Sequence, residues 1–296
     1  MRIINGHNQY SNYGGAIQIM GSSQYTLKNC TFENNWAYAY GGAIYNGVDK
    51  SLTIIDCTFK GNKADDDDGC AIYSKGKVNI ENTTFKSNKA YVDGGAIFAN
   101  GETYIKNCVF DGNSVGGAIS RCYGGAIRSK GTCTIYSSNF TNNYAEDYGG
   151  AIYACKNIYS NWNVENPTLV EISFNKVEDH GGGIYCEGSV YLKKTQVESN
   201  FLDGLSNGAG IYCKGETHLI DCDILANRMK SYITEWNNKC GGIYSEKDVT
   251  VDSSRLYNNE ARFGGAIYTN GKLTATNSRF NANEDIMAEE QYMLTR

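Results

Sequence analysis

A short glycine-rich string, Gly-Gly-Ala-Ile or a close variant of it, recurs along almost the whole chain. Its isoleucine never varies, and successive isoleucines lie 24 to 32 residues apart. A period in this range is typical of solenoids and propellers, in which each repeat is one structural unit that stacks on the next. The marker isoleucines are Ile17, Ile44, Ile72, Ile97, Ile127, Ile152, Ile184, Ile211, Ile243 and Ile267.

A second marker, an asparagine three residues after a bulky apolar residue, alternates with the isoleucine. Adjacent strands of a parallel solenoid lie about 4.8 Å apart, so each marker predicts a ladder of like side chains along the axis. We expect the asparagines at a tight corner, because Asn tolerates a left-handed backbone and its amide can bond its neighbours. They are Asn35, Asn62, Asn88, Asn113, Asn143, Asn175, Asn200, Asn227, Asn259 and Asn283.

Apolar residues between the markers alternate with a period of two, which indicates strands. The segment from Leu52 to Phe59 reads as two short strands joined by a bend at Asp56, and the isoleucine marker adds a third strand to each coil. Helical repeats fit poorly because Gly and Asn are poor helix formers, and propeller blades need about 40 residues. The sequence therefore predicts an all-β fold, a right-handed parallel β-helix of about ten coils. Residues 1–283 would form this single domain, and residues 284–296 a C-terminal cap.

The repeat also carries a family resemblance. The strings "FENN", "FKGN", "FKSN", "FDGN" and "FTNN" alternate with "GGAI" over nearly the whole chain. This pairing resembles the repeats of the chlamydial polymorphic outer membrane proteins and of similar adhesin-like proteins. The resemblance implies a β-helical passenger at the cell surface or outside the cell, used for adhesion.

Charge and hydropathy exclude several classes of partner. The net charge is -5, and Lys and Arg are scattered singly, whereas nucleic acid binding needs clustered positive charge. An apolar run of about 18 residues, which a membrane-spanning helix requires, is absent from the sequence. We therefore expect neither a nucleic acid partner nor membrane insertion.

Cysteine is abundant, with 11 residues, but its positions are those of core residues. Seven fall on inward rows, where a small apolar side chain fits between larger ones. A zinc site is disfavoured because the sequence has no Cys-x-x-Cys pair, and we expect free thiols and no cofactor. The seven are Cys30, Cys57, Cys108, Cys133, Cys186, Cys213 and Cys222.

The residue after each marker isoleucine has the opposite parity and is expected to face outward. Most of these residues are aromatic, so they predict an exposed stripe that could stack on sugar rings or bury against a partner. The alternative is that Tyr is simply a good strand former. Two insertions add Trp162 and Trp236. The predicted stripe is Tyr45, Tyr73, Phe98, Tyr153, Tyr185, Tyr212, Tyr244 and Tyr268.

Acidic residues gather just before the glycine pairs. Asp147, Asp179 and His180, with Lys176 nearby, could form the centre of a polysaccharide lyase or glycoside hydrolase, since stacking brings carboxylates about 5 Å apart. Every stacked pair in a β-helix has that separation, however, and a solvated acidic edge is the simpler interpretation. The run Asp65–Asp68 could bind calcium or form a solvated loop.

The favoured interpretation is a non-catalytic cell-surface scaffold or adhesin for a protein or glycan ligand, with a polysaccharide-cleaving enzyme as the alternative. Asn8 already occupies the asparagine corner, so the chain is expected to begin inside a coil. Such an uncapped coil would favour end-to-end association into filaments.

Overall fold

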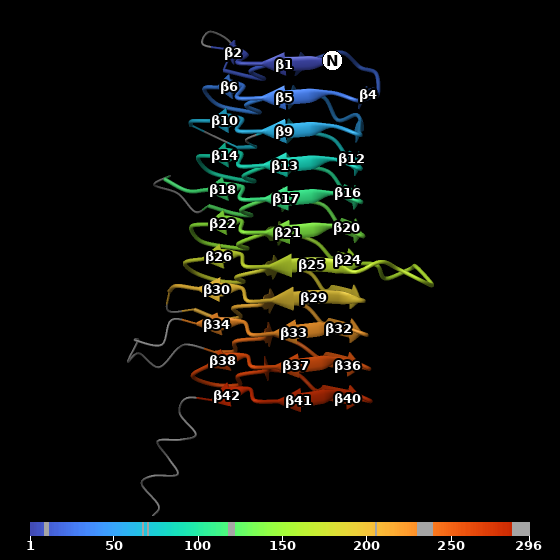
Figure 1. Ribbon diagram of the computed structural model, residues 1–296, viewed down its shortest axis with the longest axis vertical. Coiled ribbons are helices and arrows are strands. Elements are labelled where there is room, and N and C mark those ends of the chain that lie inside the picture. Colours follow the sequence, from blue (N-terminus) through green and yellow to red (C-terminus); the bar gives the residue numbers. More distant parts are fainter. Residues whose placement is uncertain are drawn as a thin grey trace, which may run out of the picture.

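The computed structural model describes residues 1–8, 12–66, 68–69, 71–117, 122–204, 206–229 and 239–285. In these residues the regular structure is β-strand, and every pair of neighbouring strands is parallel. The strands form four sheets of ten or eleven strands each, which stack as successive coils along one axis (Figure 1). The predicted parallel β-helix of about ten coils is confirmed.

We number the sheets 1 to 4 in the order in which the chain visits them. Sheet 1 consists of β1 (Arg2–Ile4), β5 (Thr31–Glu33), β9 (Thr58–Lys60), β13 (Thr84–Lys86), β17 (Val109–Asp111), β21 (Asn139–Thr141), β25 (Val170–Ser173), β29 (Thr195–Glu198), β33 (Asp223–Leu225), β37 (Arg255–Tyr257) and β41 (Arg279–Asn281). Sheet 2 consists of β2 (His7–Asn8), β6 (Trp36–Ala37), β10 (Lys63–Ala64), β14 (Lys89–Ala90), β18 (Ser114–Val115), β22 (Tyr144–Ala145), β26 (Lys176–Val177), β30 (Phe201–Leu202), β34 (Arg228–Met229), β38 (Glu260–Ala261) and β42 (Glu284–Asp285).

The other two sheets contain the isoleucine marker and the strand that follows it. Sheet 3 consists of β3 (Ile17–Ile19), β7 (Ile44–Asn46), β11 (Ile72–Ser74), β15 (Ile97–Ala99), β19 (Ile127–Ser129), β23 (Ile152–Ala154), β27 (Ile184–Cys186), β31 (Ile211–Cys213), β35 (Ile243–Ser245) and β39 (Ile267–Thr269). Sheet 4 consists of β4 (Tyr25–Lys28), β8 (Leu52–Ile55), β12 (Val78–Glu81), β16 (Thr103–Lys106), β20 (Cys133–Tyr136), β24 (Ile158–Ser160), β28 (Val190–Lys193), β32 (Thr217–Ile220), β36 (Val249–Asp252) and β40 (Leu273–Thr276).

Each coil therefore has four strands, and the prediction of three was wrong by one. The three predicted strands are those of sheets 1, 3 and 4. The strand that was not predicted belongs to sheet 2 and follows the asparagine marker. It is only two residues long, as in Trp36–Ala37, and two residues are too few to show a period of two.

The main core lies inside the coils and is built from the predicted rows. Eight marker isoleucines, from Ile44 to Ile243, are fully buried, while Ile17 and Ile267 in the outer coils are half-buried. The phenylalanines stack face to face, with ring centroids 4.7 Å apart for Phe32 and Phe59 and 4.7 Å apart for Phe110 and Phe140. This stacking follows from the strand spacing, which places equivalent rings about 4.8 Å apart.

The cysteines of the inward rows are buried between these larger side chains, and the cysteines that the structure describes are free thiols. Burial raises the pKa of Cys108 to about 11, so its thiol stays protonated and unreactive at neutral pH. The predicted role as small core residues is confirmed for all seven. Cys70 lies outside the described residues.

The asparagine marker forms a continuous buried ladder, as predicted. The amide nitrogen of each Asn donates to the amide oxygen of the next, at 2.9 Å for Asn35 to Asn62 and 3.0 Å for Asn143 to Asn175. The expected reason was partly wrong, because the left-handed residue is the one before the ladder position, such as Asn34 or Asn142. Hydrogen bonding, rather than backbone conformation, explains Asn in the ladder.

The last coil extends slightly beyond the predicted domain boundary. Strand β42 pairs with β38 up to Asp285, two residues past position 283. The segment predicted to form a C-terminal cap lies, from residue 286 on, outside the described residues. In the last described coil Phe280 is 42% exposed, whereas its equivalents from Phe32 to Leu256 are fully buried.

Candidate binding surface

The aromatic row of sheet 3 lies on the outer side of the main core, as its parity predicted, but it is not exposed. Its rings form two clusters separate from the main core, and no ring from Tyr45 to Tyr244 is more than 8% exposed. Only Tyr268, in the last coil, is half-buried. The predicted exposed stripe is therefore wrong for Tyr45, Tyr73, Phe98, Tyr153, Tyr185, Tyr212 and Tyr244.

A second layer of rings covers this row. In five coils an aromatic residue before the glycine pair packs over sheet 3, next to a first glycine with a positive φ, as at Gly149 with 67°. Tyr148 packs edge-on against Tyr185 with ring centroids 5.0 Å apart, and His180 lies 4.6 Å from Tyr212. The signal was present in the sequence, because Tyr or His precedes the pair at Tyr13, Tyr40, Tyr123, Tyr148 and His180.

Two hydroxyl groups of this row donate to glutamates in the next coil. Tyr153 donates to Glu187 at 2.9 Å, and Tyr212 donates to Glu246 at 2.8 Å. The rings of this row are thus packed like core residues, and the polar ends of Tyr153 and Tyr212 are satisfied.

The acidic residues that were considered as catalytic groups form hydrogen bonds with neighbouring turns. Asp147 accepts the backbone N–H of Cys122 at 2.6 Å, and Asp179 accepts the hydroxyl of Ser206. The Nζ atom of Lys176 lies 2.6 Å from Asp203 instead of facing either carboxylate.

His180, the third member of that group, accepts the backbone N–H of Asn207 through Nδ1 at 3.1 Å. Its Nε2 lies 3.7 Å from Asp179. Burial among the tyrosine rings lowers the pKa of His180, which favours the neutral ring. The contacts of Asp147, Asp179 and His180 therefore hold the turns before the glycine pairs together.

The run Asp65–Asp68 was considered as a calcium site, but its described carboxylates are not gathered around a common point. Asp65 lies 2.5 Å from the Nζ of Lys63 and accepts the indole N–H of Trp36 at 2.7 Å. Asp67 lies outside the described residues. Within the described ranges, no group of three His, Cys, Asp or Glu side chains is placed to hold a metal ion.

A different aromatic surface is accessible, on the outer face of sheet 4. Tyr159, Tyr191 and His218 occupy equivalent outward positions in three successive strands, with centroid distances of 4.9 and 4.8 Å. The ring of Trp162 packs edge-on against Tyr191 at 5.1 Å. We call these four residues, all half-buried, the aromatic platform. Sequence reasoning found Trp162 and missed the other three, although period-two alternation places them outward.

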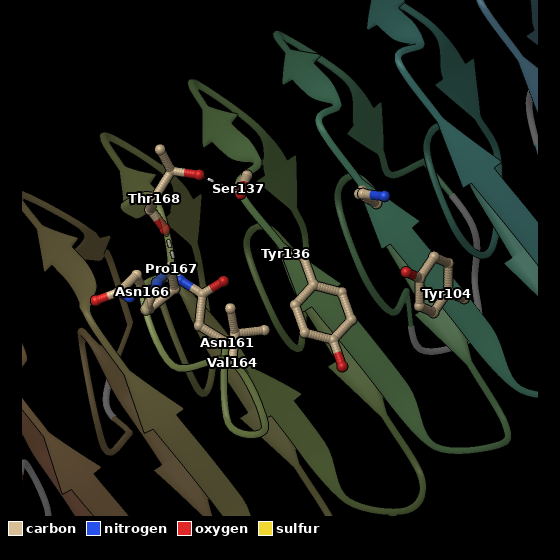
Figure 2. A pocket seen from close by; sticks show the side chains of 9 residues that line it. Tyr104, Tyr136, Ser137, Asn161, Val164, Asn166, Pro167 and Thr168 are labelled. Carbon is tan, nitrogen blue, oxygen red and sulfur yellow. Dashed lines mark hydrogen bonds between the residues drawn. The ribbon is translucent and has the colours of Figure 1, made fainter.

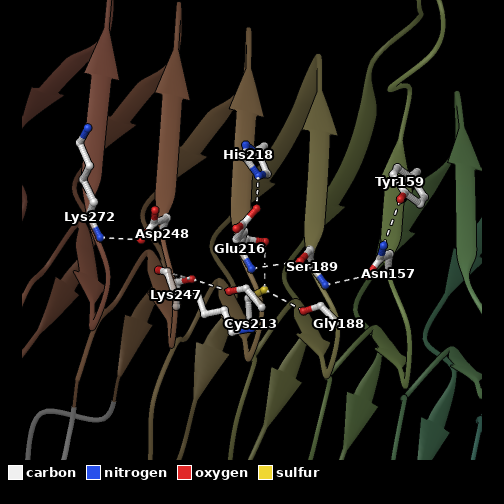
Figure 3. Close-up of polar contacts among 12 residues, drawn as sticks. Asn157, Tyr159, Gly188, Ser189, Cys213, Glu216, His218, Lys247, Asp248 and Lys272 are labelled. Carbon is white, nitrogen blue, oxygen red and sulfur yellow. Dashed lines mark hydrogen bonds and ion pairs between the residues drawn. The ribbon is translucent and has the colours of Figure 1, made fainter.

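Hydrogen bonds across the corner between sheets 3 and 4 orient the platform (Figure 3). The amide of Asn157 donates to the hydroxyl of Tyr159 at 3.0 Å and accepts the backbone N–H of Ser189 at 2.9 Å. Glu216 lies 3.1 Å from Nε2 of His218. The backbone N–H of Glu216 donates to the hydroxyl of Ser189 at 3.1 Å, so these contacts connect three successive coils beside the platform.

Trp162 belongs to an insertion, residues 161–169, that replaces the usual bend between sheets 4 and 1 and projects from the solenoid after β24 (Figure 1). Asn161 closes the base of this insertion by donating to the carbonyl of Thr168 at 2.7 Å. Lys193 donates to the carbonyl of Val164 at 2.7 Å and ties the insertion to β28. The other predicted tryptophan, Trp236, lies outside the described residues.

A hollow of about 280 Å³ lies on the other side of the insertion (Figure 2). Tyr104 and Tyr136, with ring centroids 5.5 Å apart, form one wall, and the insertion forms the other. Its lining consists of Tyr104, Lys106, Tyr136, Ser137, Asn161, Val164, Asn166, Pro167 and Thr168.

Comparison with known proteins agrees with the repeat and the fold. The family described as right-handed β-helix region matches residues 2–140, and the Chlamydia polymorphic membrane protein repeat matches residues 137–155. The second match runs through "FTNN" at residues 140–143 and "GGAI" at residues 149–152. Repeats of the chlamydial polymorphic membrane protein type are therefore present, on a right-handed parallel β-helix. No curated protein and no solved structure matches the chain.

Among the described residues, no helix is long and apolar enough to cross a bilayer.

Proposed function

We propose that this chain is a non-catalytic cell-surface adhesin whose β-helix holds a binding surface, the aromatic platform, for a glycan or protein ligand. The observation that carries the proposal is the platform itself. Tyr159, Tyr191, His218 and Trp162 are accessible rings on a rigid sheet, and the aromatic rings of sheet 3 are covered. Rings held in place lose little conformational entropy on binding and offer both apolar area and polar edges.

Three further features support an adhesin over an enzyme. Polymorphic membrane protein repeats are present, and the family name associates its members with a membrane. The carboxylates of Asp147 and Asp179 are engaged in contacts within the turns. A solenoid of stacked coils also supplies what an adhesin needs, a long stiff body on which a binding surface can be presented.

Adhesion of protein-coated beads to cells tests the proposal. The Trp162→Ala and Tyr191→Ser variants should each reduce binding about tenfold, because a central aromatic residue contributes more than about 1 kcal/mol to an interface. Tyr257→Ser, a half-buried tyrosine on the outer face of sheet 1, is the matched control and should leave adhesion unchanged.

The enzyme alternative is tested in parallel with an Asp147→Asn and Asp179→Asn double variant. If the chain cleaves polysaccharides and the double variant does not, while the platform variants remain fully active, the adhesin proposal is overturned.

A further inference from the structure

We propose that the hollow between the insertion and the tyrosines of sheet 4 binds one acidic sugar unit, a pyranose that bears a carboxylate. The inference deepens the proposed function and rests on it, because it assigns a ligand class to the surface beside the platform. The proposed sugar site does not include the platform residues, so the sugar site and the platform can be tested separately.

The size and walls of the hollow suit a single sugar ring. A volume of about 280 Å³ lies just below the range for drug-sized ligands, about 300 to 1,000 Å³, as a site for one small sugar should. Tyr104 and Tyr136 present tilted rings on one side, and Val164 and Pro167 contribute apolar surface on the other. Aromatic and aliphatic surfaces of this kind pack against the C–H face of a pyranose.

An unsatisfied acceptor lies in the wall of the hollow. Asn161 is 1% exposed, and its Nδ2 already donates to Thr168, but its Oδ1 has no hydrogen-bond partner. Figure 2 shows the Asn161 side chain between Pro167 and Tyr136. That oxygen is itself enclosed by protein atoms, so Asn161 contributes to the wall of the hollow and is not a hydrogen-bond partner for the ligand.

The hydroxyl pair of Ser137 and Thr168 adds further polar groups at the rim. The two side chains are hydrogen-bonded to each other across the mouth of the insertion. The backbone N–H of Asn161 donates to the carbonyl of Ile135 at 2.9 Å and fixes the insertion against β20. The site is therefore preformed, which reduces the entropy lost on binding.

Charge determines which sugar fits. Lys106 is the single charged residue of the lining, and no Asp or Glu contributes to it. Among the described residues no ion pair of Lys106 occurs, and its neighbour Glu81 lies on β12, on the side away from the insertion. A cation in a hollow with hydroxyl and amide groups complements a carboxylate, even though the chain as a whole carries a net charge of -5.

Calorimetric titration of the whole chain with methyl β-glucuronide, a methyl sialoside and neutral methyl β-glucoside tests this inference. The wild type should bind one of the two acidic sugars about fivefold or more tightly than the glucoside, and which one binds identifies the source of the carboxylate. Lys106→Gln should remove this preference, because it removes the single cation of the lining. Tyr136→Ser should weaken the binding of both the acidic and the neutral sugar.

Lys28→Gln is the matched control, because Lys28 occupies the same position of sheet 4 three coils away. It should retain the wild-type preference. Equal binding of acidic and neutral sugars, or a preference that survives Lys106→Gln, overturns the inference. Cell adhesion that depends on Trp162 in the absence of acidic sugar binding would leave the proposed function standing and reject only this site.

Discussion

Asn143 illustrates how one side chain joins three coils. Its Oδ1 accepts the backbone and side-chain N–H groups of Asn113, both at 3.0 Å. Its Nδ2 donates to the carbonyl of Phe110 and to Asn175, again at 3.0 Å. Because the site is fully buried, water cannot replace any of these partners. The amide is the side-chain group that both donates and accepts twice, which explains why the position repeats as Asn.

Replacement of Asn143 with Leu should destabilise the protein by roughly 3 kcal/mol or more, because two donors of Asn113 and one acceptor of Asn175 lose a partner in the interior. Urea unfolding followed by circular dichroism measures the change. Asn142→Gly is the control, since residue 142 is exposed and its φ of 56° suits glycine. Similar stabilities of the two variants would show that the ladder contributes little.

Among the elements, sheet 3 differs from the others because both of its faces are buried. Its inner face carries the marker isoleucines, and its outer face carries the stacked rings covered by the residues before the glycine pairs. Tyr185 is typical, with Tyr153 at 5.0 Å and Tyr212 at 4.8 Å in nearly parallel orientation. Sheet 4, by contrast, has one buried and one accessible face, as in Val190–Lys193.

Tyr185→Ser and Tyr191→Ser are therefore expected to differ in their effect on stability. The first should reduce the free energy of unfolding by about 3 kcal/mol, because it opens a cavity between stacked rings. The second should change it by less than about 1 kcal/mol, since one face of the ring is accessible. Thermal denaturation of the two variants, with adhesion measured on the same samples, separates stability from binding. Loss of adhesion without loss of stability in Tyr185→Ser would restore the sheet 3 row as a binding surface.

The sequence predicted features that depend on local periodicity and missed features that depend on how segments fold over one another. The ladders of Ile, Phe and Asn could be predicted because each coil repeats the same pattern. Parity correctly placed Tyr185 outside the main core, but it could not show that Tyr148 folds back over it. The insertion with Trp162 could be recognised by its length, whereas its position beside Tyr104 and Tyr136 follows from tertiary contacts alone.

Across the whole molecule, each coil contacts only its neighbours, so stability is expected to vary along the axis. Leu273 and Phe280 in the last described coil are 45% and 42% exposed, whereas the equivalent residues Val190 and Val197 are fully buried. Amides of β27 to β29 should therefore exchange with deuterium roughly a hundredfold more slowly than those of β39 to β41. Hydrogen exchange with mass spectrometry measures this gradient. Uniform protection would indicate that all coils unfold as one cooperative unit.

The translational regularity of the four sheets has a consequence for how such a chain can change in evolution. Because the register is the same from one coil to the next, with Ile on Ile and Asn on Asn, a duplicated or deleted coil would meet neighbours of the same shape and hydrogen-bonding pattern. Each such event would alter the length of the solenoid by one strand spacing, about 4.8 Å. The number of coils therefore sets the distance between the Trp162 insertion and either end of the solenoid, and this distance can change while the core stays the same.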